Sequence, residues 1–386
     1  MSYISQEFKR VLLKKKISLI ITFVFIIILG LVSVSRTQTY QEQLSQSKGT
    51  LYNFKTMDKA ETIKTGISRY SKDIAENEKL IVDLESKLDK INNYDKTKLD
   101  AKIIELEKQN DRKNEYEINQ LKYDKQYDIE TYNLVPKGIY KSFDMLASFF
   151  PVLFLFIIII LLSDILSGEN DPNTIKLLVT KSISRTRIII SKFVVSIFLS
   201  VSIIILSAIT FILEAGIHLG FSDYKLPFDI GSRYVLDTAI PLTTISSQMS
   251  YVSESRHFLP IWSALIILLL ILLISSVSII SIIMFISTIS KNPLISVVTN
   301  LILIVGSGAW CFLKLTSGYL IAAQYGVVCK LLPITYMIDN IDVLSGDISV
   351  RLNNSISIFF TLMVCLFWIL IMMSLSTYIF AKRDFD

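Results

Sequence analysis

Few side chains in this sequence have the types and spacing that catalysis or metal binding requires. The chain contains two histidines, His218 and His257, and its three cysteines form no Cys-x-x-Cys or Cys/His spacing. A His-rich metal site and a His-based catalytic triad are therefore not expected. The sequence has no GxxxxGK[ST] segment, so it does not predict ATP binding through a phosphate-binding loop. We expect no catalytic residue, no metal ligand and no cofactor in this chain.

Polar side chains close to long apolar runs are the remaining candidates for chemistry. Asp164 and Glu214 lie at the ends of such runs, which favours interfacial residues over an ion-coupled pathway through a membrane. Small hydroxyl residues inside a run usually pack against a neighbouring helix, with a substrate pathway or a dimer contact as the alternative. One such series lies on one side of a predicted helix: Ser275, Ser278, Ser281 and Thr288.

The elements that carry these residues are apolar enough to be membrane helices. Hydrophobic residues make up 52% of the 386, and a spanning helix needs ~20 of them in succession. The first run is longer than the apolar part of a signal peptide and no cleavage signal follows it, so we expect it to be retained. The fourth run, with 33 residues, must tilt or begin at the membrane surface. The expected spans are residues 17–35, 145–166, 193–213, 258–290, 292–313 and 352–381.

Charge places the connecting segments on two sides of the membrane. The segments assigned to the cytoplasm, with the loop after the second span counted from Asp164, hold 13 Lys and Arg against 6 Asp and Glu, whereas the two shorter outer segments hold 6 against 8. This asymmetry satisfies the positive-inside rule with both termini in the cytoplasm, and it does not resemble a nucleic-acid-binding surface. The cytoplasmic segments are an amphipathic basic helix at 1–16, a loop at 167–192, Lys291 and a tail at 382–386. The outer segments are residues 36–144, 214–257 and 314–351.

Residues 36–144 differ in composition from the rest, with 20 basic and 20 acidic residues. Apolar residues at spacings of three, four and seven run through residues 67–91, and a second, shorter series begins at Leu99. Between the two series, residues 92–96 carry a turn signal. We expect an extracellular, coiled-coil-like antiparallel helical hairpin over residues 58–127, turning at 92–96; the alternative is a flexible charged linker.

Residues 315–329 form an apolar stretch of intermediate length. Fifteen residues of helix reach about 22 Å at ~1.5 Å per residue, short of a ~30 Å hydrocarbon core. A crossing would also place the basic pair Lys382-Arg383 outside. We expect a re-entrant or interfacial segment within residues 314–351, and a helix lying on the membrane surface is the alternative.

The sequence of the loop at 167–192 indicates a folded element and not only a connection between two spans. Asp171-Pro172 is a helix start, because Asp accepts backbone N–H groups and Pro suits the first helical position. An apolar face follows at residues 175–179. The pattern predicts a short amphipathic helix that could enter the groove of a partner. The alternative is an ordinary basic loop at the membrane surface.

This segment resembles the first cytoplasmic loop of ABC-2 type transporter permeases. The resemblance rests on Glu169, Thr174, Leu177-Leu178, Ile183-Ser184-Arg185 and Lys192-Phe193, in matching order after the second span. The chain departs from the family pattern at Asn173, where a glycine is usual, and at Ser182, where a proline is usual. In that family the loop is the coupling helix that docks into the ATPase subunit. The resemblance therefore implies that the ATPase contact is made by Glu169, Asp171, Asn173, Thr174, Leu177, Leu178, Ser184 and Arg185.

The expected fold is an all-α membrane protein with six transmembrane helices. The resemblance implies that the chain is the permease subunit of an ABC-2 exporter in a bacterial plasma membrane. It would act with a cytosolic ABC ATPase, which would hold ATP and Mg. It would also pair with a second permease copy, identical or different. Its substrate would be amphipathic or hydrophobic: an antimicrobial peptide, a drug or a lipid-like molecule. Two alternatives remain open. The chain could transmit ATPase motion to the outer side without transport, or it could be a membrane-anchored receptor whose hairpin docks a ligand.

Overall fold

The computed structural model describes residues 3–37, 40–65, 70–92, 98–109, 114–129, 138–169, 184–221 and 223–382. These residues divide into two compact units. The first consists of Met1–Leu31 and Gly138–Asp386, and the second is Val32–Lys137. The chain is mostly helical, and six helices in its described part are long and apolar enough to cross a membrane. The number of spans expected from the sequence is therefore confirmed.

The six long helical segments are built from eleven elements, some of them continuous with one another. The second segment joins α6, η3, α7 and the short turn η4, and the fifth joins α11, η5 and α12. The elements are α1 (Tyr3–Ser35), α6 (Gly138–Asp144), η3 (Met145–Phe149), α7 (Phe150–Leu162), η4 (Ser167–Glu169), α9 (Arg185–Leu219), α10 (Ile261–Ile289), α11 (Pro293–Asn300), η5 (Leu301–Val305), α12 (Gly306–Thr316) and α17 (Ile358–Lys382).

Several helix ends differ from the expected boundaries. Residues 3–16 and 17–35 form one continuous helix, α1, rather than a surface helix followed by a span. The second segment begins at Gly138, seven residues before the expected start at 145. Helix α9 begins at Arg185, before the uncharged run, because the charge of Lys192 is neutralised inside the protein rather than left at its surface. In these three segments the helix is longer than the uncharged run that it contains.

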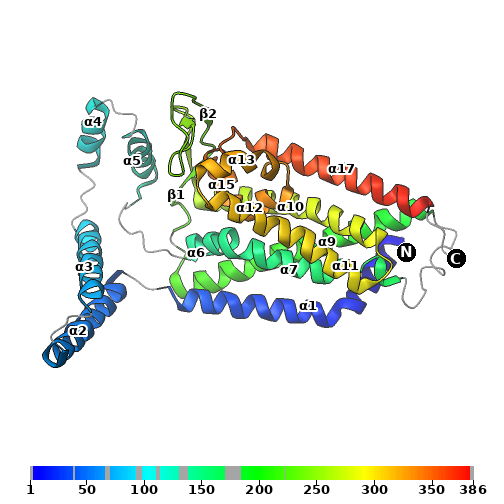
Figure 1. Cartoon of the computed structure of the whole chain (residues 1–386), viewed down its shortest axis with the longest axis horizontal. Coiled ribbons are helices and arrows are strands. Elements are labelled where there is room, and N and C mark those ends of the chain that lie inside the picture. Colours follow the sequence, from blue (N-terminus) through cyan, green and yellow to red (C-terminus); the bar gives the residue numbers. More distant parts are fainter. Residues whose placement is uncertain are drawn as a thin grey trace. The chain divides into compact units, whose positions relative to one another are not determined.

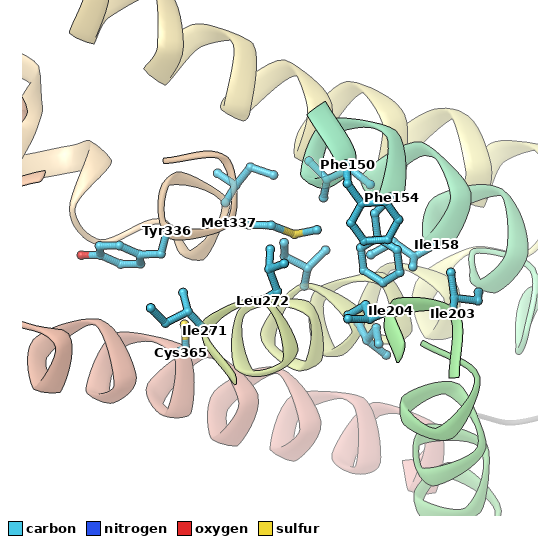
Figure 2. Close-up of a cluster of buried hydrophobic side chains, with 14 of the residues drawn as sticks. Phe150, Phe154, Ile158, Ile203, Ile204, Ile271, Leu272, Tyr336, Met337 and Cys365 are labelled. Atoms are coloured by element: carbon cyan, nitrogen blue, oxygen red, sulfur yellow. The ribbon is translucent and has the colours of Figure 1, made fainter. Parts of the chain in front are cut away.

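The core of the first unit surrounds α10 (Figure 1), which packs against α7, α9 and α17. Figure 2 shows the aromatic side chains of α7, Phe150 and Phe154, facing aliphatic residues of α9 and α10. On the same side of α10 in this view, Tyr336 and Met337 lie above Ile271 and Leu272, and both are fully buried. This apolar packing fixes the positions of the helix ends, where the charged residues lie.

Residues 220–260 contain short strands, so the all-α expectation is wrong in this region. Strand β1 (Pro227–Ile230) pairs antiparallel with β4 (His257–Pro260), and β2 (Tyr234–Leu236) pairs antiparallel with β3 (Met249–Tyr251). The strands are three or four residues long, and prolines begin β1 and end β4. Strands this short carry almost no alternation of apolar and polar residues, so the sequence pattern predicts an outer segment here without indicating strands.

Residues 319–351 form four short helices: α13 (Tyr319–Cys329), α14 (Pro333–Ile338), α15 (Asn340–Ser345) and α16 (Ile348–Arg351). Helix α13 has 11 residues, fewer than a membrane span needs. It packs against α12, and a Cβ on Gly326 would lie 2.3 Å from the carbonyl oxygen of Leu352. The helical part of the stretch expected at 315–329 is thus present, and its entry into a membrane stays a prediction.

The second unit contains two helix pairs instead of one long hairpin. Helix α2 (Tyr40–Thr65) packs against α3 (Ser71–Asn92), with ion pairs Lys48–Glu85 and Lys55–Glu78, each at 2.7 Å. Helix α4 (Leu99–Gln109) packs against α5 (Glu115–Tyr127) around a small apolar cluster of Leu99, Ile103 and Leu121. The expected pairing of residues 58–91 with 99–127 is therefore wrong. The expected turn at 92–96 lies almost wholly outside the described residues.

Cross-linking distinguishes the two arrangements in the intact protein. Cysteines replacing Lys55 and Glu78 are expected to join with a short bismaleimide, because these residues form an ion pair across α2 and α3. Cysteines replacing Glu85 and Lys102, which a single hairpin turning near residue 94 would bring opposite each other, are expected to remain unlinked. Efficient linking of the second pair and none of the first would contradict the observed helix pairs. Electrophoresis after protease cleavage between the two sites provides the readout.

Candidate functional site

Three helices bring charged side chains together at the two ends of the segment 170–183. Glu169 ends η4 directly before this segment, and Lys192 lies two turns into α9, after it. The third contribution comes from the first turns of α1, with Glu7 and Arg10 three residues apart on one face. We call Glu7, Arg10, Glu169 and Lys192 the charge cluster.

Lys192 is the most deeply buried member of the charge cluster, with 1% of its side chain exposed. Its Nζ donates to Glu7 Oε1 (2.9 Å), to Glu169 Oε1 (3.3 Å) and to the carbonyl oxygen of Ile165 (2.9 Å). All three hydrogens of the ammonium group can therefore be used. A buried lysine is tolerated when its charge is both paired and hydrogen-bonded, as it is here.

Arg10 completes the charge cluster from its more exposed side. Its guanidinium donates to both carboxylate oxygens of Glu169, at 3.1 Å from Nη1 to Oε2 and at shorter range from Nη2 to Oε1. Nη2 also donates to Glu7 Oε1 at 2.8 Å. Two carboxylates and two cations make the cluster neutral. The bidentate arrangement fixes the orientation of Glu169 as well as its charge.

A second ion pair lies one helical turn along α1. Lys15 Nζ donates to both oxygens of Asp164, at 2.7 and 2.8 Å. Asp164 thus pairs with α1 and is still partly exposed, in agreement with a position at the end of a span. The two ion-pair groups together fasten the N-terminal half of α1 to the turn that precedes residue 170.

Hydroxyl groups fasten the same turn to the rest of the bundle. Ser287 Oγ accepts from the backbone N–H groups of Leu166 and Ser167, at 3.2 and 3.1 Å. Ser296 Oγ donates to the carbonyl oxygen of Ser163 at 2.5 Å. All of these groups are buried, so these hydrogen bonds hold the turn at 163–169, which follows α7, in place against α10 and α11.

The hydroxyl series expected in α10 is buried inside the subunit. Ser275 contacts Cys365 of α17 at 4.0 Å, and Ser281 donates to the carbonyl oxygen of Trp368 at 3.4 Å. Ser278 and Thr288 are fully buried as well, and Thr288 donates to Met284 in its own helix at 2.7 Å. Within this chain the series lies at helix contacts, and its part in a pathway or a dimer contact stays a prediction.

The expected ATPase contacts divide into described and undescribed residues. Ser184 is exposed and precedes α9 as its N-terminal flanking residue, while Arg185 Nη1 donates to the carbonyl oxygen of Ala381 at 3.0 Å. Arg185 therefore lies at the end of α17, where a cation complements the last carbonyls of the helix. Glu169 is 5% exposed, which makes it an anchor rather than an open contact. The remaining expected contacts lie outside the described residues: Asp171, Asn173, Thr174, Leu177 and Leu178.

The sequence profile described as ABC-2 family transporter protein matches residues 1–385. The chain belongs to the ABC-2 family. As an ABC-2 permease with six apolar helices, it is a multi-pass membrane protein. Comparison with characterised proteins and with solved structures gives no match.

The family match extends further than the resemblance read from the loop. It includes residues 32–137, so the second unit lies within the matched range of this ABC-2 permease. The loop motif included Glu169, Arg185 and Lys192, whereas Glu7 and Arg10 belong to the helix that the sequence places at the membrane surface. One signal for the charge cluster was present in the sequence: Glu7 is the single acidic residue among residues 1–16 and lies three residues before Arg10.

Proposed function

We propose that this ABC-2 permease is the membrane subunit of an ATP-driven exporter, and that residues 167–192 are its contact with a cytosolic ABC ATPase. ATP and Mg belong to that partner. The transporter contains a second permease copy, identical or different, and functions in a bacterial plasma membrane. The transported molecule is amphipathic or hydrophobic.

The charge cluster is the observation that carries this proposal. Glu169 and Lys192 lie near the two ends of the segment 167–192 that would meet the ATPase, and they are joined to each other at 3.3 Å and to α1 through Glu7 and Arg10. Both ends of the segment are thus fixed to buried groups of the bundle. A force applied to the segment by the ATPase would move α1, α7 and α9 together instead of being absorbed by a flexible loop.

The test targets the apolar face of the segment. Aspartates replacing both Leu177 and Leu178 are expected to abolish co-purification of the ATPase and stimulation of its activity, because charge would enter an apolar contact. The melting temperature of the permease is expected to stay unchanged. As a control, Leu331→Asp changes an exposed leucine outside this segment and is expected to leave ATPase binding intact.

Full ATPase binding and stimulation in the double variant would refute the assignment of residues 167–192. Loss of binding in both variants would show that the effect is not specific to this segment. Reaction of the ATPase-bound complex with a maleimide at residue 174, changed to cysteine, provides a second readout. That cysteine is expected to be protected only when the ATPase is present.

A second candidate function is transmission of ATPase motion to the outer side without transport. The second unit favours it, because its helix pairs expose many charged residues and bury few apolar ones. Such a surface is suited to contact with another macromolecule. Movement of a labelled amphiphile across proteoliposomes, dependent on ATP, would support export; ATP hydrolysis with no such movement would support transmission.

A further inference from the structure

Two cavities share a wall near the segment 339–351, at the end of the first unit that carries the strands. The first has a volume of about 600 Å³ and the second about 750 Å³. Asp342 and Arg351 line both of them. In Figure 1 the helices α12, α13 and α15 and strand β2 surround this region. Volumes of this size suit a small organic ligand.

The first cavity is lined mainly by apolar side chains of α7 and α12. Val152 and Phe156 of α7 are each 41% exposed, and Phe312 of α12 is 46% exposed. Partial exposure of the lining on apolar helices means that the cavity opens on the side of the bundle that lipid would cover. An alkyl or aryl group could therefore enter from the membrane without crossing water.

The second cavity has a different chemistry. The rings of Tyr234, Tyr251 and Tyr319 line it, together with the carboxylates of Asp342 and Asp347. Aromatic faces and carboxylates are the groups that recognise ammonium and guanidinium ions in proteins. The two cavities thus place an apolar surface and a cation-attracting surface on either side of one wall.

The charges around the shared wall do not balance. Arg351 Nη1 binds Asp339 Oδ1 at 2.6 Å and Asp342 Oδ2 at 2.5 Å, so one guanidinium faces two carboxylates. Asp347 accepts from Tyr234 Oη at 2.6 Å and adds a third negative charge. Arg256 pairs with Asp229 at 2.9 Å and lies over the Tyr251 ring, 5.0 Å from its centroid, so it neutralises Asp229 and leaves the excess of negative charge at Asp342 and Asp347 unchanged.

The protonation of the buried carboxyl groups Asp339 and Asp342 bears on this excess of negative charge. Burial raises the pKa of the Asp339 carboxyl to about 6, while the nearby Arg351 opposes that rise. Burial likewise raises the pKa of Asp342, and Arg351 again opposes it. At pH 7.5 Asp339 is above its pKa and ionised. A cationic group would therefore neutralise charge in this region, whereas an anion would add to it.

We propose that the two cavities form one binding site for a single-chain cationic amphiphile, whose apolar chain lies in the first cavity and whose ammonium or guanidinium group reaches the second. The conclusion that this ligand belongs to the class of transported substrates rests on the proposed permease function. Binding itself requires neither ATP nor the ATPase. It is therefore tested on the permease alone.

Charge, rather than the alkyl chain, supplies the selectivity of this site. A chain that leaves the bilayer for an apolar cavity exchanges one apolar environment for another and gains little. A cation that leaves the membrane interface gains the attraction of Asp342 and Asp347. Amphiphiles with the same chain and different head groups are thus the informative probes.

The experiment uses the full chain in nanodiscs of zwitterionic lipid at pH 7.5. The probe is dodecyltrimethylammonium with a diazirine in its chain, and labelled peptides are mapped by mass spectrometry. We expect saturable labelling of residues 148–156 and 305–312. Unlabelled dodecyltrimethylammonium is expected to compete at least about tenfold better than dodecyl sulfate or dodecanol, because only the cation gains charge attraction.

Three variants complete the test. Ala309→Trp fills the first cavity from an exposed position and is expected to abolish the labelling, while Val298→Trp, exposed on α11 and outside both cavities, is expected to leave it unchanged. Asp347→Asn is expected to weaken competition by the cation about tenfold at unchanged labelling by a neutral diazirine alkane. If it lowers the melting temperature, Ala309→Trp alone remains decisive.

Equal competition by the cationic, anionic and neutral amphiphiles would overturn the proposal, and so would unchanged labelling of Ala309→Trp. These outcomes are separate from failure of the proposed function. A permease that binds the cation but does not bind an ATPase would contradict the ATPase contact and leave this site standing.

Discussion

Replacing Lys192 with methionine is expected to lower the free energy of unfolding by about 3–5 kcal/mol, the range seen when one partner of a buried ion pair is removed. The substitution keeps the length of the side chain and removes three hydrogen bonds. Glu7 and Glu169 would then share Arg10 alone, so the charge cluster would carry an uncompensated negative charge. Unfolding in mixed micelles, followed by circular dichroism, measures the change.

Arg187→Met is the matched control, because Arg187 belongs to the same helix and is exposed. It is expected to change the unfolding free energy by no more than about 0.5 kcal/mol. Adding Glu7→Gln to Lys192→Met leaves one carboxylate, Glu169, opposite Arg10, which restores the charge balance and is expected to recover part of the loss. Equal stability of Lys192→Met and Arg187→Met would show that the charge cluster does not stabilise the bundle.

The second large effect is expected from Gly346→Ala, between α15 and α16. Gly346 has φ of +95°, and a Cβ there would lie 1.9 Å from the carbonyl oxygen of Ser232. That oxygen belongs to a backbone segment held by a hydrogen bond from Ser232 N to Ser345 O at 2.8 Å, so it cannot move alone. We expect a marked loss of folded protein in detergent, measured by size-exclusion chromatography and melting temperature.

Gly306→Ala provides the comparison for this substitution. Gly306 is helical, and a Cβ there would meet nothing within 4 Å. Alanine costs less than glycine inside a helix, so this variant is expected to match or exceed the stability of the original chain. Comparable melting temperatures for the two variants would contradict the close approach of Gly346 to Ser232.

The number of spans could be predicted from the sequence because each span is a local property. A run such as residues 193–213 lacks charge whatever it packs against, and its length alone indicates a helix across the membrane. The start of α9 could not be predicted in this way. It includes Lys192, whose partner Glu7 is 185 positions away in the chain, and a hydropathy pattern contains no information on that pairing.

Helix pairing in the second unit was predicted incorrectly for a related reason. The apolar series of α3 includes Ile81 and Leu84, and such a series indicates a packed face without naming its partner. Gly66 directly follows the end of α2 at Thr65 and is the type of residue that commonly follows a helix end. Helices end both at Thr65 and at Asn92, and the sequence pattern does not indicate across which of these two ends α3 packs.

The candidate site was predictable in part. The segment 167–192 was identified from its motif. Glu169 and Arg185 belong to the parts of it that the structure describes, before and after residues 170–183. The involvement of Glu7 and Arg10 required the fold, because surface and buried charges look alike in a sequence. Burial of Glu169 also changes its expected role, from a residue that meets the partner to one that fixes the position of the contact.

Helix α1 has the geometry of a lever. It is uninterrupted from Tyr3 to Ser35 and contains no proline, so it bends little along its length. Its charged attachment lies at residues 7–10, and Leu31 is ~33 Å further along at ~1.5 Å per residue. A tilt of about 5° at the attachment would displace Leu31 by about 3 Å. The second unit begins at Val32, so a rotation of this size at the charge cluster would move the point where that unit joins the chain by about 3 Å.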